Sequence, residues 1–324
     1  MNAYLILILV ILIGTFLLDL TVDILNLRHL KMALPEEFEG VYDQGTYRRS
    51  QEYLKETTRF KQFSEAVAVP VVIVFILAGG FDWVDQAARG FHWGSISTGL
   101  LFAGILMLAS QLLSLPFQIY STFGIEQRYG FNRTTPRTFV LDLLKAWGLV
   151  AVLGGAVFSF VVWFFEHAGS WAWVYCWLGV SLFEIGVIFI APVLILPLFN
   201  KFTLLEEGPL REAIEAYARS QRFALQGIFT MDGSKRSTKS NAFFVGLGRF
   251  RRIVLYDTLI EKHTIEELVS VLAHEMGHYK KRHILISTVL SILTTGLMFW
   301  ILSLFIRNPG LFAAFQMEQT SVYA

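Results

Sequence analysis

The sequence is poor in cysteine and in charged residues. Its 324 residues include one cysteine, Cys176, which excludes an internal disulfide framework and a zinc site built from cysteines. Charged residues make up 16% of the chain, against roughly a quarter in an average soluble domain. The net charge of +1 says nothing about nucleic acid, but the chain has no long basic run, and we expect no nucleic-acid partner. Apolar residues make up 54% and the mean hydropathy is +0.53, which indicates a membrane protein.

Six apolar runs are candidates for crossing a bilayer, which takes roughly 20 predominantly apolar residues. They are residues 3–18, 66–81, 99–120, 146–165, 171–198 and 284–306. The first run has no Lys or Arg ahead of it and no small-residue cleavage pattern after it, so we interpret it as a retained helix. The fold class that we predict is therefore a mainly α, multi-pass membrane protein with six spans in this chain.

The links between the apolar runs differ sharply in charge. Lys and Arg are concentrated in three long links, residues 27–64, 121–145 and 200–283. The two short links that alternate with them hold a single basic residue, Arg89. Because basic loops tend to stay in the cytoplasm, we expect the three long links to be cytoplasmic and the N-terminus to be outside or lumenal.

Residues 200–283 are the only stretch long enough for a folded aqueous domain. We therefore divide the chain into residues 1–199, with five spans and their loops; residues 200–283, the aqueous domain; and residues 284–324, with the sixth span and the end of the chain. Strand-like and helical runs alternate in the aqueous segment. We expect a small α+β domain on the cytoplasmic side.

The expected elements of this domain follow from local patterns. A helical run is followed by three β-like runs and a second helix: residues 206–221, 227–231, 241–247, 251–257 and the segment after Thr264. Thr264 and Glu267 have the spacing of a capping box, which marks the start of the second helix.

The second helix contains His274, Glu275 and His278 in an HExxH pattern. Residues four apart on a helix lie about 40° apart around its axis and about 6 Å along it, so both imidazoles can bind one zinc ion. Glu275 lies about 100° from His274, where it can reach a zinc-bound water without binding the metal. We therefore predict a domain of the zincin type in which His274 and His278 are zinc ligands. Glu275 is the general base, which takes a proton as the water attacks a peptide carbonyl. The alternative is a structural helix whose polar face meets the lipid headgroups.

Three other features have both a functional and a structural interpretation. Asn241 opens the strand-like NAFFVG, which either binds substrate as an added strand at a sheet edge or is an ordinary core strand. Residues 280–283, which include His283, lie at the membrane boundary, and we interpret them as anchors that reach the headgroups. Glu184, an acid inside the fifth span, is a functional candidate by its location, or is tolerated there by surrounding water.

Three stretches carry a family resemblance: PLFNKFTLLEEGPLREAIE, MDGSKRSTKSNAFFVGLGRFRRIVLYDTLIE and LVSVLAHEMGHYKKRH. They resemble the type I CAAX prenyl proteases, which are integral-membrane zinc endopeptidases. The resemblance implies seven membrane helices that enclose a water-filled chamber, with the metal helix facing it from the cytoplasmic side. For eukaryotic members, it also implies release of the last three residues from CaaX sequences whose cysteine is prenylated. Residue by residue, it places Asn241, Ala242 and Phe243 in a substrate-binding edge strand, and the HExxH residues keep the roles given above.

The end of the chain departs from the family. The family's third zinc ligand is a glutamate in an ExxAD-type motif after a seventh span, whereas Ile306 is followed here only by RNPGLFAAFQMEQTSVYA. Glu318 lacks the ExxAD context. We therefore expect the third ligand, a glutamate, beyond residue 324, and we interpret the chain as part of a longer protein.

The resulting hypothesis is a membrane zinc metalloendopeptidase that hydrolyses peptide bonds near the C-terminus of prenylated CaaX-type or other membrane-proximal substrates. We expect one zinc ion per complete chain and a membrane that is the endoplasmic reticulum or a prokaryotic plasma membrane; in a prokaryote the substrate is unknown. Two alternatives stay open. One is a heat-shock-type quality-control metalloprotease, which has a shorter chain before its motif. The other is an inactive, zinc-deficient membrane fragment, because two histidines alone hold zinc weakly.

Overall fold

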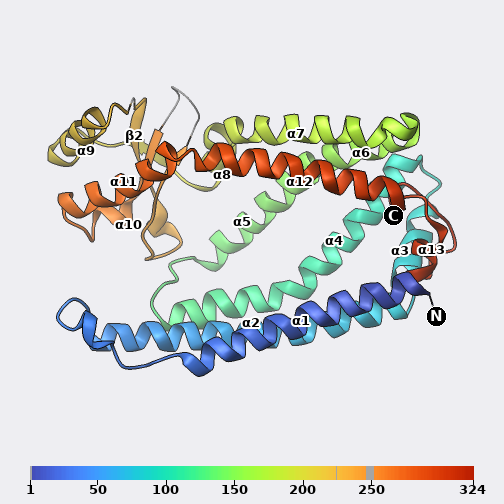
Figure 1. Cartoon of the computed structure of the whole chain (residues 1–324), viewed down its shortest axis with the longest axis horizontal. Helices are drawn as coiled ribbons and strands as arrows, with labels where there is room; N and C mark the ends of the chain where they lie inside the picture. Colours follow the sequence, from blue (N-terminus) through green and yellow to red (C-terminus); the bar gives the residue numbers. More distant parts are fainter. Residues whose placement is uncertain (1, 224, 246–251) are drawn as a thin grey trace. The chain divides into compact units, whose positions relative to one another are not determined.

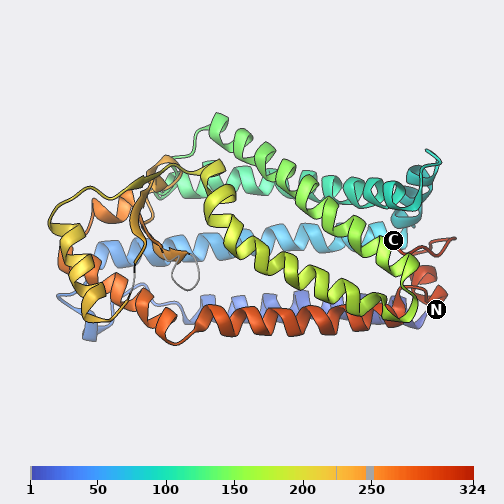
Figure 2. The same ribbon diagram turned by 90° about the horizontal axis from the view of Figure 1, so that it is seen from above.

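The computed structural model describes residues 2–223, 225–245 and 252–324, and most of it is helical (Figures 1 and 2). Among these residues, six helical segments are long and apolar enough to cross a membrane, which confirms the predicted number of spans. The end of the β-like run 241–247 and the first residue of the run 251–257 lie outside the described residues. The chain divides into a first unit, Met1–Gly130 with Ser303–Ala324, and a second unit, Phe131–Leu302.

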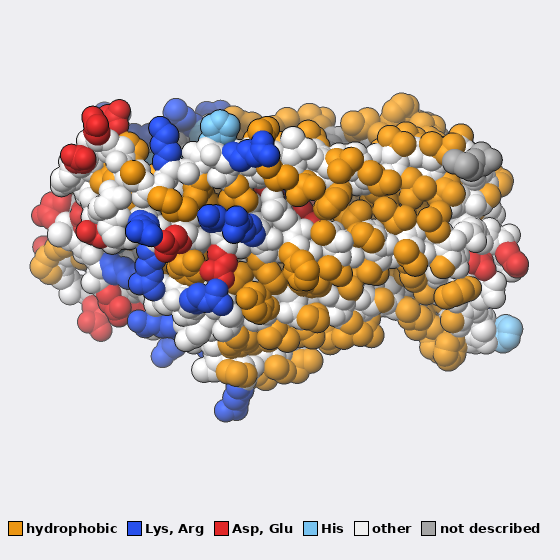
Figure 3. All heavy atoms as spheres, turned by 90° about the horizontal axis from the view of Figure 1, so that it is seen from below, with side chains coloured by type: hydrophobic (Ala, Val, Ile, Leu, Met, Phe, Trp, Pro, Cys, Tyr) orange, Lys and Arg blue, Asp and Glu red, His pale blue; other side chains and the backbone are white. Residues whose placement is uncertain are grey.

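The long helices present apolar side chains to their surroundings. Leu18, Val152, Leu182 and Met298, on four different spans, are each more than 60% exposed. Figure 3 shows hydrophobic side chains along the long helices on the face drawn. A soluble protein rarely leaves so much continuous apolar surface uncovered, whereas a bilayer solvates it favourably.

The described residues of the first unit form three long α-helices and two short ones. They are α1 (Ala3–His29), α2 (Gln44–Leu77), α3 (Gly80–Arg89), α4 (Ser95–Tyr120) and α13 (Pro309–Ala314). α2 packs along α1, and α4 continues into a π-helical turn, Ser121–Glu126. The second span ends earlier than the predicted boundary at residue 81. Gly79 adopts a left-handed conformation (φ +73°), which ends α2 and turns the chain into α3.

The second unit contains the remaining helices. They are α5 (Pro136–Leu149), α6 (Gly155–His167), α7 (Ala172–Ile190), α8 (Leu196–Phe199), α9 (Pro209–Ser220), α10 (Asp257–Ile260), α11 (Ile265–Lys280) and α12 (His283–Phe305), the last running on into the first unit. Figure 1 shows α6 beside α7, and the two pack together. The Trp177 indole N–H donates to the carbonyl of Ile292 at 2.8 Å, which ties α7 to α12. Gly296 makes room for this ring, because a Cβ there would lie 2.8 Å from it.

A four-stranded sheet lies in the second unit, in the order β1-β2-β4-β3. The strands are β1 (Phe202–Leu204), β2 (Gly227–Met231), β3 (Ala242–Val245) and β4 (Arg252–Tyr256). β2 and β4 are parallel, and the two outer pairs are antiparallel. The three predicted β-runs correspond to β2, β3 and β4. The sequence did not predict β1, because three largely exposed residues produce no periodic pattern.

α9 and α11 cover one face of this sheet. Ile214 of α9, Ile228 and Ile253 of the sheet, and Leu272 and Met276 of α11 form one buried core. Burial of Leu272 and Met276 on the inner side of α11 sets the rotation of that helix. The histidines at positions 274 and 278 are consequently left on its exposed side.

The start of α11 has the capping box that the sequence predicts. The Thr264 hydroxyl accepts from the Glu267 N–H at 3.3 Å, and the Glu267 carboxylate accepts from the Thr264 N–H at 2.9 Å. The bond from Thr264 and a second from His263 lower the pKa of Glu267. The contribution of Glu267 to stability is therefore present at neutral pH and is lost only as the pH falls through that lowered pKa.

We expect Thr264→Ala to destabilise the second unit by about 1 kcal/mol, because an N–H at the helix start loses its acceptor. Thermal unfolding of the solubilised protein and amide exchange in the first turn of α11 would measure the loss. Ser270→Ala is a matched control in the same helix, since the Ser270 hydroxyl only donates to the Glu266 carbonyl four residues back. Equal stability of the two variants would contradict the role of the cap.

Candidate functional site

The rings of His274 and His278 face each other on the exposed side of α11. Their Nε2 atoms are 3.1 Å apart, and the ring centroids are separated by 4.8 Å. Two nitrogen ligands bound at the usual distance to one tetrahedral zinc ion lie about 3.3 Å apart. The two imidazoles are therefore placed as a pair of metal ligands would be.

Two nitrogens do not complete a zinc site. In the described part of the chain, no group of three His, Cys, Asp or Glu side chains is placed to hold a metal ion. The donor types and the spacing of the histidine pair fit zinc, and a third protein ligand is not found among the described residues.

Glu275 follows the first histidine on α11 and is half-buried. It forms no hydrogen bond or ion pair with another described residue. Its carboxylate is therefore not used to hold the fold together, which suits a group that has to accept and release a proton.

His283 lies beside this pair, where the sequence predicted only a membrane anchor. Its Nδ1 is 2.8 Å from the Nδ1 of His278. Arg282, in a left-handed conformation (φ +56°), separates α11 from α12 and directs the chain back at this point. No helical spacing could have revealed the contact, because the two histidines belong to different helices.

The predicted substrate strand lies at an edge of the sheet. β3 pairs with β4 on one side and packs against α11, and no described strand pairs with its other side. The Tyr256 N–H donates to the Asn241 carbonyl at 3.0 Å, so these two residues form a hydrogen-bonded pair. Because such pairs alternate along an antiparallel ladder, Phe243 also directs its backbone groups to β4. Ala242 and Phe244 direct theirs to the open edge.

Because of this register, the three predicted substrate residues differ in which of their backbone groups are already hydrogen-bonded. The backbone of Phe243 is occupied by β4, and its ring packs against Tyr256 at a centroid distance of 6.2 Å. The Ala242 N–H is already bonded to the side-chain oxygen of Asn241 at 2.9 Å. No described residue pairs with the Ala242 carbonyl or with either backbone group of Phe244, a residue that the sequence did not single out.

Arg236 ties the loop before β3 to the membrane helices of the same unit. Its guanidinium binds both carboxylate oxygens of Asp142 on α5, at 2.7 and 2.9 Å. It also donates to the Asn200 side chain and to the Phe199 carbonyl, each at 2.7 Å. The side chains of Arg236 and Asp142 are 24% and 22% exposed, so solvent screens the pair only in part. The edge strand thus follows a loop that is held by two spans.

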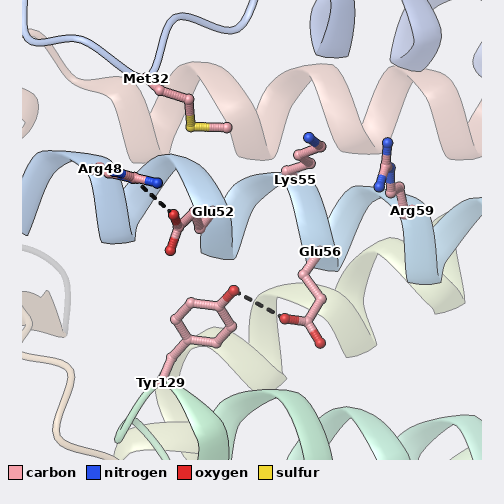
Figure 4. A pocket seen from close by; sticks show the side chains of 7 residues that line it. All are labelled: Met32, Arg48, Glu52, Lys55, Glu56, Arg59 and Tyr129. Atoms are coloured by element: carbon pink, nitrogen blue, oxygen red, sulfur yellow. Dashed lines mark hydrogen bonds and ion pairs between the residues drawn. The ribbon is translucent and has the colours of Figure 1, made fainter.

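A separate cavity lies in the first unit, with a volume of about 520 Å³ (Figure 4). Side chains of α2 line it together with Met32 and Tyr129. Glu52 is paired with Arg48, and Glu56 accepts from the Tyr129 hydroxyl at 2.9 Å. Burial and the Glu56 carboxylate raise the pKa of Tyr129. None of the described HExxH or edge-strand residues lines this cavity.

Glu184 lies within α7 and is half-buried. It makes no hydrogen bond or ion pair with another described residue. Its contacts therefore support neither of its two interpretations.

Comparison with known proteins agrees with this arrangement of spans, sheet and HExxH helix. Residues 23–201 match the family model of the CAAX prenyl protease N-terminal part, five membrane helices, and residues 204–324 match peptidase family M48. The probable CAAX prenyl protease 1 of Schizosaccharomyces pombe is 36% identical over 84% of this chain and 60% of its own length. The CAAX prenyl protease 1 homolog of Oryza sativa is 35% identical over 95% of this chain and 74% of its own length.

A solved structure is also similar to this chain. The crystal structure of S. mikatae Ste24p matches with a TM-score of 0.92 and 33% identity, over 97% of this chain and 75% of that one. The chain spans less than two thirds of the length of the S. pombe relative. Two family models that together cover most of the chain, and these relatives, show that this multi-pass membrane protein belongs to the CAAX prenyl protease family, within peptidase family M48.

Proposed function

We propose that the chain forms the main part of a membrane zinc endopeptidase that cleaves near the C-terminus of prenylated CaaX-type proteins. The observation that carries the proposal is the pair of Nε2 atoms, 3.1 Å apart, on a helix that packs against an open sheet edge. The imidazoles suit a zinc ion, and the edge suits an extended peptide. The names of the relatives and the six spans support a membrane-bound substrate.

In this mechanism His274 and His278 would hold the ion, and the third ligand would be the glutamate that we expect beyond residue 324. When bound, zinc acidifies water and polarises a carbonyl. Glu275 takes a proton from the attacking water and passes it to the leaving amine. The open backbone groups of Ala242 and Phe244 keep the peptide extended, so that its scissile bond stays in place during both proton transfers.

The proposed location follows from the same parts of the chain. The basic links favour a cytoplasmic catalytic domain, with an N-terminus that is outside or lumenal. The membrane is that of the endoplasmic reticulum or a prokaryotic plasma membrane. A lipid-anchored substrate would reach such a domain without leaving the bilayer surface.

The proposal is tested with protein expressed from the complete gene and reconstituted in liposomes. We expect cleavage of a prenylated CaaX peptide, loss of cleavage with a zinc chelator, and recovery when zinc is added back. The same peptide without its prenyl group is the control. Cleavage of misfolded membrane proteins but not of the prenylated peptide would favour the heat-shock-type alternative. Purified protein without zinc and without activity would favour the inactive alternative.

The register of β3 makes a prediction about how the peptide binds. Replacing single amides of the substrate by esters removes one N–H at a time, and each lost hydrogen bond should lower kcat/KM by about 2- to 12-fold. Only alternate substrate residues can face the edge strand, so the effect should recur at every second position. An ester scan without this alternation would contradict binding as an added strand.

A further inference from the structure

His283 is placed on the side of His278 that is turned away from the metal position. The Nε2 of His278 faces His274 at 3.1 Å, whereas its Nδ1 faces the Nδ1 of His283 at 2.8 Å. The two nitrogens of an imidazole ring point in different directions. His283 therefore does not share an ion with the other two histidines and is not a third ligand.

The hydrogen-bonding capacity of the rings determines the direction of this contact. A neutral imidazole has one N–H and one free lone pair. If His278 binds metal through Nε2, its proton is on Nδ1 and is donated, so the Nδ1 of His283 must accept. Metal-bound histidines normally have such a partner, which orients the ring and increases its basicity. No described carboxylate or carbonyl bonds to the Nδ1 of His278, and an imidazole occupies that place instead.

We propose that His283 is a positioning residue, which accepts a hydrogen bond from His278 and holds the Nε2 of His278 toward the metal. The proposal rests on the proposed zinc peptidase function. The rings meet at 76° with centroids 4.9 Å apart, an arrangement that restrains rotation of His278. His283 is also the first residue of α12, so the candidate metal ligand is tied directly to the start of a membrane span.

Two substitutions of His283 distinguish positioning from anchoring. His283→Asn keeps an acceptor close to the position of Nδ1 but removes a side chain that can be cationic. His283→Lys keeps a basic side chain at the membrane boundary but can accept no hydrogen bond. We expect the Kd for zinc, measured by chelator competition on the complete protein, to rise about 10- to 100-fold in His283→Lys. It should stay close to the wild-type value in His283→Asn.

Three further measurements make the result decisive. Lys281→Ala, which removes a boundary charge without touching either histidine, should bind zinc like the wild type. Cobalt substituted into the site should show altered absorption bands in His283→Lys only. Thermal unfolding checks that each variant folds. If His283→Asn does not fold, His283→Gln is a second variant that keeps a hydrogen-bond acceptor.

The possible outcomes separate this proposal from the proposed function. If the wild type binds zinc and His283→Lys binds it equally well, the positioning role is wrong while the peptidase hypothesis stands. If His283→Asn loses zinc as His283→Lys does, acceptance of the hydrogen bond is not what matters, and the positioning role is again overturned. A wild type that binds no zinc would overturn the proposed function and this role together.

Discussion

Glu275→Gln should abolish peptide hydrolysis while zinc stays bound. Glutamine has nearly the same size and shape as glutamate but cannot take a proton from water, and a general base contributes about 10²- to 10⁴-fold to a rate. Glu275 bonds to no other described residue, so the substitution should leave the fold intact. The measurement is kcat on a prenylated CaaX peptide, together with the zinc content of the purified protein.

His278→Ala is the comparison that gives this result its meaning. That variant should lose both zinc and activity, because it removes one of the two nitrogens found at metal-ligand spacing. Full activity in Glu275→Gln would show that another group is the base. Loss of zinc from Glu275→Gln would make Glu275 a ligand and would contradict the roles assigned along the HExxH helix.

Arg236→Lys should destabilise the second unit by roughly 2–4 kcal/mol, although the positive charge is kept. Arg236 binds Asp142 with two nitrogens and reaches two further oxygens, on Asn200 and Phe199. A lysine ammonium cannot reproduce this planar arrangement of donors. Since the loop that contains Arg236 leads into β3, we also expect a higher KM for the peptide and faster amide exchange in β3.

The control for this substitution is Arg219→Lys in the same unit. Arg219 faces Glu215 at 3.5 Å with a side chain that is 71% exposed, and such surface pairs contribute less than about 1 kcal/mol. Thermal unfolding of the two variants in detergent would give the comparison. If Arg236→Lys unfolded at the same temperature as Arg219→Lys, the Arg236 contacts would not hold the loop.

The mechanism stays a prediction, but short stretches of the sequence were enough to predict the elements that it requires. The apolar runs predict the spans because length and hydropathy alone decide whether a helix can cross a bilayer. Thr264 and Glu267 predict the start of α11, and the four-residue spacing of His274 and His278 places both on one side of a helix. Each of these inferences depends on residues within a few turns of one another. The sequence alone was therefore sufficient for them.

Other parts of the site depend on contacts between distant segments. The bidentate pair of Arg236 with Asp142 joins residues 94 positions apart, and no local pattern marks it. The edge register depends on where β4 pairs with β3, which decides that Phe244 and not Phe243 presents free backbone groups. The composition around His283 is that of a membrane anchor, so it did not reveal the contact with His278.

By itself, the sequence predicted the class of the molecule, its spans and the capped HExxH helix, because hydropathy and helical periodicity are local properties. That His274 and His278 bind zinc stays a prediction. Only the tertiary structure decided which backbone groups are open to a peptide, how the loop before the edge strand is held, and that His283 faces His278. These are properties of packing, in which side chains far apart in the chain meet.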